Sequence, residues 1–248
     1  MIEVRDLTFR YSSNLPLVLK GISLSIPMGS LTCIMGSNGS GKSTLARGLN
    51  GLLTPTTGTV IADGLNTQNP AARHEIRRKV GLVFQDPNLQ MTSVTVEREL
   101  AFGLENLRTD WEEMHSRVEE YLGLFGFKAR RDDPPSSLSA GERQQLAIAS
   151  VMILTPSYLV LDEATSLLAA RTRSLILNMV STLRQRHHVA VILITQYPSE
   201  ALLGERLIVI HEGKIMFDDQ PERVFQHADV LVRMGVPVPL RERLRVMR

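Results

Sequence analysis

The sequence contains little cysteine, little net charge and no long hydrophobic run. Among its 248 residues Cys33 is the only cysteine, which excludes an intrachain disulfide and any cysteine-based metal motif, and we expect a reducing compartment such as the cytosol. The 28 basic and 26 acidic residues leave a formal net charge of +2, so the overall charge does not favour binding to nucleic acid. The longest apolar stretches, such as residues 189–194, are far shorter than the ~20 residues that span a bilayer. The first six residues lack the basic and apolar regions of a signal peptide, so we expect a soluble chain that a partner brings to any membrane on which it acts.

A glycine-rich loop follows the apolar run at residues 31–35 and precedes a helical pattern at residues 44–50. The loop fits the pattern G-x-x-x-x-G-K-[ST], and a strand before it with a helix after it is the context that this pattern requires in a P-loop. The backbone N–H groups of such a loop point at an anion, and the start of the helix adds its positive end. Lys42 can reach the β- and γ-phosphates, and the Ser43 hydroxyl can ligate Mg²⁺. We therefore expect nucleotide binding by Gly36, Ser37, Asn38, Gly39, Ser40, Gly41, Lys42, Ser43 and Thr44.

Two carboxylates follow directly from a second buried strand, which is predicted at residues 158–162. These are Asp162, the last residue of the run, and Glu163. In a P-loop protein an aspartate at this place holds Mg²⁺, directly or through water. Glu163 is placed to orient and deprotonate a water molecule aimed at the γ-phosphate.

Two other features have both a structural and a functional interpretation. Tyr11 is either an ordinary aromatic residue of an edge strand or a ring that stacks on an adenine base, a contact worth ~1–3 kcal/mol by analogy with stacking on nucleic-acid bases. Ser139 is predicted to cap a helix over residues 143–154, with Glu142 three residues later completing a capping box. That structural role is compatible with a functional one.

The order of these landmarks resembles the nucleotide-binding subunit of ABC transporters, and the likeness covers nearly the whole chain. Tyr11 falls where the family has its base-stacking aromatic, and Gln85 ends the strand that opens its glutamine loop. Residues 138–142, here called the signature segment, read Leu-Ser-Ala-Gly-Glu and look like the family's LSGGQ or LSGGE. Residues 158–163 look like its Walker B strand with the catalytic glutamate. Residues 83–90, 95–97 and 101–106 are most similar to the ATPase subunits of energy-coupling-factor importers, which bring vitamins or transition-metal ions into prokaryotic cells.

The patterns and the resemblance together predict an α/β fold. We expect a P-loop NTPase core with a mostly parallel sheet, N-terminal antiparallel β-strands and an inserted α-helical subdomain. The core would comprise residues 1–86 and 156–230, and the helical subdomain with the signature segment residues 87–155. Residues 231–248 would form a short basic C-terminal extension, either a solvated helix or tail or a subunit contact, with Arg241, Arg243, Arg245 and Arg248.

The resemblance also implies a mechanism that uses ATP and Mg²⁺. Two such subunits pair head to tail, and each ATP lies between the P-loop of one and the signature segment of the other. Ser139, Ala140, Gly141 and Glu142 would then contact a nucleotide held by the partner. Gln85 would join Ser43 and Asp162 at Mg²⁺, and the catalytic set would be Glu163, Gln196 and Gln85. The implied partners are a second ATPase subunit, a transmembrane coupling subunit and a membrane substrate-binding subunit at the cytoplasmic face of the cell membrane, with no nucleic acid.

Three positions depart from the family's pattern. Ala140 stands where the signature usually has glycine, and Ala169 stands where an aspartate makes a contact across the dimer interface. Gln196 occupies the switch position, where the family has a histidine that bridges the γ-phosphate and the attacking water. An amide can donate a hydrogen bond to phosphate but cannot carry a proton as imidazole does. A positioned acid–base group contributes ~10²–10⁴-fold to a rate. We therefore expect this site to bind ATP but to hydrolyse it more slowly than a site with histidine. This suggests that the chain is one half of a heterodimer with unequal sites.

Two alternatives to an energy-coupling-factor ATPase stay open. The chain could be the ATPase of another ABC importer or exporter. It could also be a degenerate regulatory half of a heterodimer, which holds nucleotide without turning it over. Ala169 and Gln196 favour the regulatory alternative, whereas Glu163 argues against it.

Overall fold

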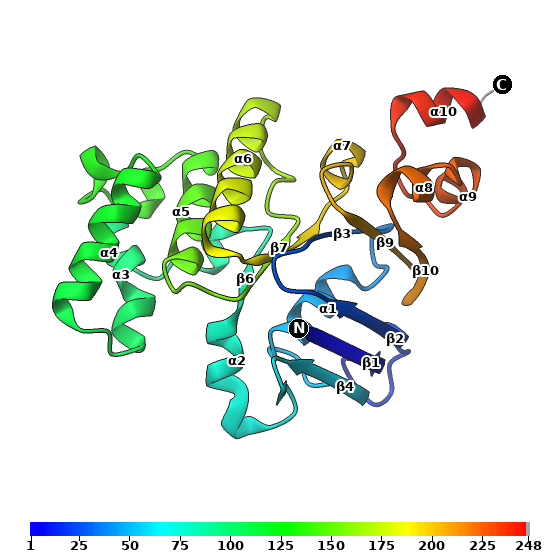
Figure 1. The fold of residues 1–248 in the computed structure, drawn as a ribbon, viewed down its shortest axis with the longest axis horizontal. Helices are drawn as coiled ribbons and strands as arrows, with labels where there is room; N and C mark the ends of the chain where they lie inside the picture. The colour runs from blue at the N-terminus through cyan, green and yellow to red at the C-terminus, as the bar shows by residue number, and fades with distance from the viewer. Residues whose placement is uncertain (247–248) are drawn as a thin grey trace. The chain divides into compact units, whose positions relative to one another are not determined.

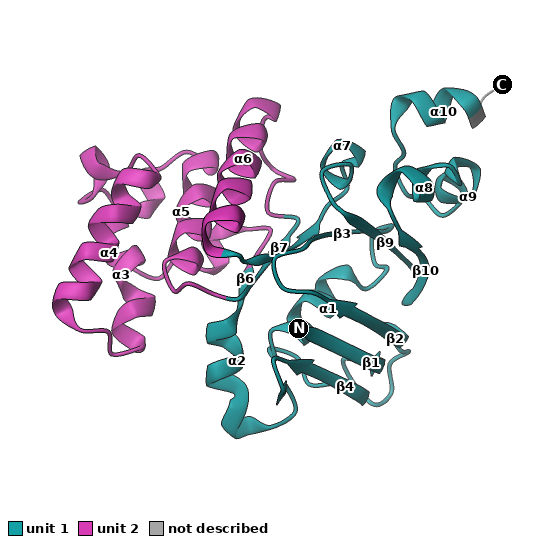
Figure 2. Ribbon diagram, viewed as in Figure 1, with its two compact units in different colours: residues 1–82, 157–163, 188–248 teal, residues 83–156, 164–187 magenta. Residues whose placement is uncertain are grey.

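The computed structural model describes residues 1–246, which form two compact units (Figure 1, Figure 2). Of the described residues, unit 1 comprises 1–82, 157–163 and 188–246, and unit 2 comprises 83–156 and 164–187. Arg248, the last of the four arginines predicted for the C-terminal extension, lies outside the described residues. The domain bounds predicted from the sequence stay a prediction, because a division by compactness does not test them.

Unit 1 contains an antiparallel sheet formed by the N-terminal part of the chain. Its strands are β1 (Ile2–Phe9), β2 (Leu19–Ile26), β4 (Thr57–Ala62) and β5 (Leu65–Asn66), in the order β2-β1-β4-β5. Ile2 pairs with Ile26 on one side and with Ala62 on the other, and all three side chains are buried. Along β1, buried residues alternate with less buried ones at both ends of the strand. Such a pattern is typical of a sheet that covers a core with one face. The predicted N-terminal antiparallel strands are confirmed.

The second sheet of the protein is six-stranded and mostly parallel. It comprises β3 (Leu31–Met35), β6 (Val80–Val83), β7 (Tyr158–Asp162), β8 (Ala190–Ile194), β9 (Arg206–His211) and β10 (Lys214–Asp219), in the order β10-β9-β3-β8-β7-β6. Strands β9, β3, β8 and β7 run parallel, and β10 returns antiparallel to β9. Every residue of β7 and β8 is buried, because the strands of a parallel sheet are covered on both faces. The predicted α/β fold is confirmed.

The helices of unit 1 connect and cover these strands. They are α1 (Lys42–Leu49), α2 (Arg73–Lys79), α7 (Pro198–Ala201), α8 (Pro221–Phe225), α9 (Ala228–Arg233) and α10 (Leu240–Val246), with the 3-10 turn η1 at Pro70–Ala72. Helix α1 contacts both β4 and β7, so it links the two sheets. Leu45 and Leu49 lie on its fully buried face. Helix α2 is basic, with Ile76 buried and Arg77 and Arg78 exposed.

Unit 2 is helical. Its helices are α3 (Val96–Asn106), α4 (Trp111–Leu124), α5 (Ala140–Met152) and α6 (Ala170–His187), with 3-10 turns η2 (Pro87–Leu89), η3 (Lys128–Arg130) and η4 (Pro135–Ser137). Helix α3 contacts α4 and α5, and α5 contacts α6. Leu104, Leu122 and Leu146 are fully buried within this unit. The predicted α-helical subdomain is therefore present in the fold.

Candidate functional site

The carboxyl ends of three neighbouring strands meet at one edge of the parallel sheet. In the register of this sheet, Ile194 at the end of β8 pairs with Ile34 of β3 on one side and with Asp162 of β7 on the other. The residues that follow these strands therefore lie together, although those after β3 are more than a hundred positions away in sequence from those after β7 and β8. In open α/β sheets this edge is where ligands bind.

The P-loop, residues 36–44, leaves β3 at this edge and has no room for side chains at two of its glycines. A Cβ atom on Gly36 would lie 2.2 Å from the backbone oxygen of Ile210. Gly41 has φ 105°, and a Cβ atom there would lie 2.7 Å from Cδ2 of Leu19. Glycine adopts such backbone angles without a steric penalty. The loop can therefore curl tightly and point its N–H groups at a bound anion.

The Lys42 side chain is turned inward at the start of α1. Its Nζ donates to the backbone oxygens of Gly36 at 3.0 Å and Ser37 at 3.1 Å, and lies 3.6 Å from Oε1 of Glu163. Burial lowers the pKa of Lys42, and the neighbouring Glu163 carboxylate opposes that shift. The ammonium group is thus held within the loop, where phosphate oxygens can replace the loop carbonyls as its acceptors.

Ser43 and Asp162 present two oxygens to each other across the sheet edge. The Ser43 hydroxyl donates to Oδ1 of Asp162 at 2.9 Å. Burial raises the pKa of Asp162, and the hydrogen bond from Ser43 works against that shift. Within the described residues no group of three or more His, Cys, Asp or Glu side chains could hold a metal ion. A buried carboxylate next to a hydroxyl fits Mg²⁺, which binds few protein oxygens and completes its shell with water and phosphate.

Glu163 adopts a backbone conformation that is uncommon for a residue other than glycine. Its φ is 51°, and its N–H donates to the backbone oxygen of Ile194 at 3.1 Å. Left-handed backbone angles persist outside glycine only where the surrounding structure holds them, and they concentrate at functional sites. The hydrogen bond to β8 holds the backbone of Glu163, and its carboxylate lies 3.6 Å from the Lys42 ammonium.

Gln196 links the P-loop to Glu163. Its amide Nε2 donates to Oδ1 of Asn38 at 2.6 Å and to Oε1 of Glu163 at 3.1 Å. Both amide hydrogens therefore have acceptors within this site. Motif spacing alone did not indicate the contact with Asn38, because the two residues lie 158 positions apart.

The segment that carries Gln196 is fixed by two polar residues that the sequence analysis missed. Thr195 donates from its hydroxyl to the carboxylate of Glu200, and that hydroxyl accepts the N–H of Tyr197 at 3.0 Å. Thr195 and Glu200 are each 1% exposed. A buried acid in the four-residue helix α7 has no periodic pattern to reveal it, so the sequence carried no signal for this role.

Tyr11 lies beside the P-loop helix with its ring accessible. The ring is 54% exposed and packs edge-on against Phe9, with 4.9 Å between ring centroids. Its hydroxyl forms a hydrogen bond of 3.0 Å with Thr44. This geometry is compatible with stacking on a base, which stays a prediction.

The signature segment lies in unit 2 at the start of α5. The predicted capping box is confirmed, since Ser139 accepts from the N–H of Glu142 and Glu142 accepts from the N–H of Ser139. Gly141 approaches Thr172 so closely that a Cβ atom would lie 2.6 Å from its Cγ2. A hollow of about 410 Å³ lies beside this segment, and its lining includes Ser139, Ala140, Gly141 and Glu142 together with Leu167, Leu168 and Ala169. Two of the three positions that depart from the family's pattern, Ala140 and Ala169, therefore border the same hollow.

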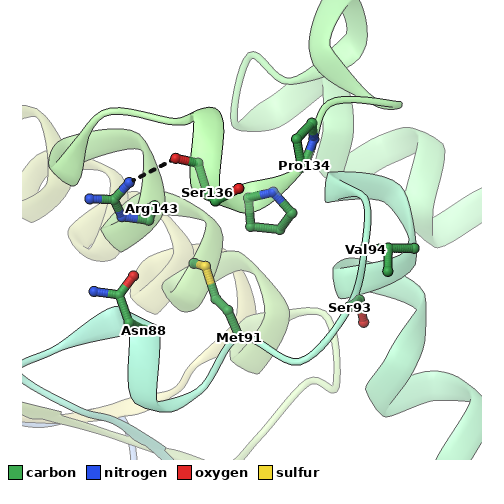
Figure 3. Close-up of a pocket in the computed structure, with 8 residues that line it drawn as sticks. Asn88, Met91, Ser93, Val94, Pro134, Ser136 and Arg143 are labelled. Carbon is green, nitrogen blue, oxygen red and sulfur yellow. Dashed lines mark hydrogen bonds between the residues drawn. The ribbon is translucent and has the colours of Figure 1, made fainter.

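Gln85 and the stretch after it also belong to unit 2. The Gln85 amide donates to the Ser166 hydroxyl at 3.1 Å. A second hollow, of about 450 Å³, lies beside the following stretch, with Asn88, Met91 and Val94 on one side and Pro134 and Arg143 on the other (Figure 3). The role of Gln85 at Mg²⁺ stays a prediction.

Comparison with known proteins assigns these features to a family. Residues 19–166 match the family described as ABC transporter. Over 245 residues the chain is 39% identical to the energy-coupling factor transporter ATP-binding protein EcfA1 of Ligilactobacillus salivarius, covering 99% of this chain and 86% of that protein. The solved structure of cbiO1 from Clostridium perfringens, part of the ABC transporter complex cbiONQ, is 30% identical with a TM-score of 0.84 and 98% coverage of both chains.

A third relative was solved as a dimer with its products. The ATP-binding cassette MJ0796 in a post-hydrolysis state, bound to ADP and Pi, is 27% identical with a TM-score of 0.80, covering 89% of this chain and 99% of that one. Within residues 1–246 of the present chain, no helix is both long and apolar enough to cross a membrane.

Proposed function

This chain belongs to the ABC transporter family and is similar to ATP-binding subunits of energy-coupling-factor transporters. We propose that it is the ATP-hydrolysing subunit of such an importer. It would power the uptake of a vitamin or a transition-metal ion from the cytoplasmic face of the cell membrane. The observation that carries this proposal is the convergence of Lys42, Ser43, Asp162, Glu163 and Gln196 at the edge where β3, β7 and β8 end.

Each of these side chains has a distinct task in the proposed reaction. Lys42 would exchange its loop carbonyls for β- and γ-phosphate oxygens, while the P-loop N–H groups bind the remaining phosphate charge. Ser43 and Asp162 would hold Mg²⁺, which neutralises charge on the phosphates when bound. Glu163 would orient the attacking water and accept its proton. Gln196 would position Glu163 through one amide hydrogen and would turn the other from Asn38 to the γ-phosphate when nucleotide is bound.

A second subunit would complete the site. MJ0796, the relative bound to ADP and Pi, is a dimer. In this chain the signature segment offers the first-turn N–H groups of Ala140 and Gly141, which have no partners within a helix. A helix start of this kind favours phosphate. We infer a head-to-tail pair in which the signature segment contacts the ATP held by the partner, and in which closure around ATP moves the membrane subunits.

Co-purification tests this function directly. A tagged form of the chain, extracted with its native membranes, should carry a transmembrane coupling subunit and a small membrane substrate-binding subunit, and the complex should hydrolyse ATP. Membrane partners typical of another class of ABC importer or exporter would replace the energy-coupling-factor assignment by the first alternative. Purification without any membrane protein would contradict a transport function.

The Gln196 contacts support unequal sites in the assembled pair. The amide aims Glu163 but supplies no proton carrier, so this site should bind ATP well and turn it over slowly. A regulatory half that never hydrolyses ATP is the second candidate function, and the absence of imidazole at position 196 favours it. Glu163 opposes that candidate, because its carboxylate lies within 3.6 Å of Lys42 at the sheet edge.

Replacing Gln196 by histidine separates these possibilities. Gln196→His should accelerate single-turnover hydrolysis at this chain's own site by about tenfold or more, since it restores an acid–base group. Gln196→Ala should slow the reaction, because Glu163 loses its amide donor. Gln226→His, at an exposed position after α8, is the matched control and should leave the rate unchanged. A fast ATPase from the isolated chain that Gln196→Ala leaves unaltered would refute the idea of a weakened site.

A further inference from the structure

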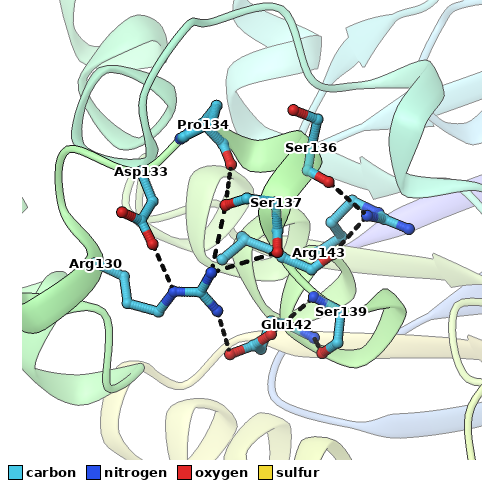
Figure 4. A network of polar contacts seen from close by, with 9 residues as sticks. Arg130, Asp133, Pro134, Ser136, Ser137, Ser139, Glu142 and Arg143 are labelled. Carbon is cyan, nitrogen blue, oxygen red and sulfur yellow. Dashed lines mark hydrogen bonds and ion pairs between the residues drawn. The ribbon is translucent and has the colours of Figure 1, made fainter.

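Four charged residues surround the start of α5 in unit 2, and we call Arg130, Asp133, Glu142 and Arg143 the charge cluster (Figure 4). Arg130 contacts both acids: its Nε donates to Oδ2 of Asp133 and its Nη1 to Oε1 of Glu142, each at 2.8 Å. A third contact ties the guanidinium to the backbone oxygen of Ser137 at 3.4 Å. The Arg143 guanidinium donates to the backbone oxygen of Leu138 at 2.6 Å. The cluster thus combines two positive and two negative side chains.

Glu142 places a full negative charge where the signature segment would receive phosphate. One of its oxygens accepts from Arg130, and the other accepts from the backbone N–H of Ser139 at 2.8 Å. The hydrogen bonds from Ser139, with a further contribution from Arg130, lower the pKa of Glu142, so its carboxylate is ionised at neutral pH. A helix start carries only about half a positive charge. Left alone, Glu142 would therefore more than cancel the potential that attracts an anion there.

The charge cluster removes that conflict. Because two arginines balance two carboxylates, the side-chain charges of the cluster sum to zero. The positive end of the helix dipole at the start of α5 therefore remains available to attract a ligand. We propose that Arg130 is a positioning residue for the partner-held nucleotide: by binding the Glu142 carboxylate it neutralises the signature segment and fixes that side chain. This inference rests on the proposed function, because it assumes that the signature segment contacts ATP.

The same argument explains why glutamate is acceptable at position 142. The family's signature ends in either glutamine or glutamate, which differ by one charge at this position. With glutamine no counter-charge is needed, whereas glutamate needs a cation within hydrogen-bond distance. Arg130 supplies that cation here, from the 3-10 turn η3 twelve residues earlier in the chain.

The test is a double-mutant cycle on the transporter complex purified through this chain, with MgATP as the probe. Arg130→Ala should raise the KM for ATP by about 10- to 100-fold, the range expected for one charge-assisted hydrogen bond, and kcat should change far less. In the Glu142→Gln background, Arg130→Ala should change KM by less than about threefold, since the two effects are coupled. The rise in KM should also shrink at high ionic strength, which screens exposed charges. Arg131→Ala is the matched control, because Arg131 pairs with Glu97 and Glu119 instead, and it should leave KM near the parent value.

Arg130→Gln covers the case in which the alanine variant does not fold, since it keeps amide donors and loses only the charge. It should show the same rise in KM, whereas Arg130→Lys should stay close to the parent. An unchanged KM in the neutral variants would overturn the inference, and so would a rise that persists in the Glu142→Gln background, because Arg130 would then serve only to hold the loop. A parent complex that does not hydrolyse ATP would instead overturn the proposed function itself, and this inference with it.

Discussion

Replacing Glu163 by glutamine should lower the rate of ATP hydrolysis by about 10²- to 10⁴-fold, the usual contribution of a positioned general base. Glutamine has the same shape but cannot accept the proton of the attacking water. ATP binding should persist, because Lys42, Ser43 and the P-loop backbone are unaltered. The variant should therefore accumulate as an ATP-bound pair of subunits that cannot open. Single-turnover hydrolysis gives the rate, and size-exclusion chromatography with and without ATP reports the pair.

Glu222→Gln provides the matched control for this substitution. Glu222 is an exposed acid in the first turn of α8 within the same unit. The control should hydrolyse ATP at the parent rate and should not accumulate as an ATP-bound pair. If Glu163→Gln also retains the parent rate, Glu163 is not the base, and the buried Asp162 beside it becomes the carboxylate to examine.

Replacing Lys42 by alanine should weaken nucleotide binding by about 10- to 100-fold, since it removes charge-assisted hydrogen bonds to the phosphates. The ammonium is 5% exposed and burial lowers its pKa, so the cost of burying its charge offsets the attraction of the Glu163 carboxylate 3.6 Å away. The loss should therefore appear in affinity rather than in the stability of the unliganded chain. Equilibrium titration with a fluorescent ATP analogue measures the affinity, and thermal unfolding without nucleotide checks the stability.

Lys214→Ala is the control for the lysine substitution. Lys214 is exposed at the start of β10, so removing its charge alters the net charge equally but leaves the P-loop intact. Its affinity for the analogue should match that of the parent. Equal affinity in Lys42→Ala and the parent would mean that the phosphates lie elsewhere than at the P-loop.

The fold could be predicted from the sequence because the residue patterns that indicate its main strands and helices are local. Residues 31–35 and 158–162 are short apolar runs, and both are strands of the parallel sheet. Helical spacing likewise placed a helix over residues 143–154, to within a few residues of the observed bounds of α5. The capping box at Ser139 was predictable for the same reason, since its two partners are three residues apart. Elements without periodicity were missed: helices α7, α8 and α9 have four to six residues, too few for a repeating apolar pattern.

The start of strand β2 depends on partners that are distant in sequence. The alternation of apolar residues at Ile22, Leu24 and Ile26 marks only the later part of this strand, whereas it begins at Leu19. Leu19 pairs with Phe9 of β1, and the N–H of the neighbouring Lys20 donates to the backbone oxygen of Gly213 at 2.9 Å. These partners come from other parts of the chain, so neighbouring residue types did not reveal the longer strand.

By itself, the sequence determined which chemical groups this protein uses: a phosphate-binding loop with Lys42 and Ser43, and a buried strand that ends in Asp162 and Glu163. Such motifs are contiguous, so their backbone geometry follows from neighbouring residues. Only the tertiary structure decided how these groups meet. Parallel pairing of β3, β8 and β7 sets Ser43 against Asp162 and places the Gln196 amide between Asn38 and Glu163. The pairing of Arg130 with Glu142 likewise depends on the fold of unit 2. Contacts of this kind depend on strand register and side-chain direction, which sequence spacing does not fix.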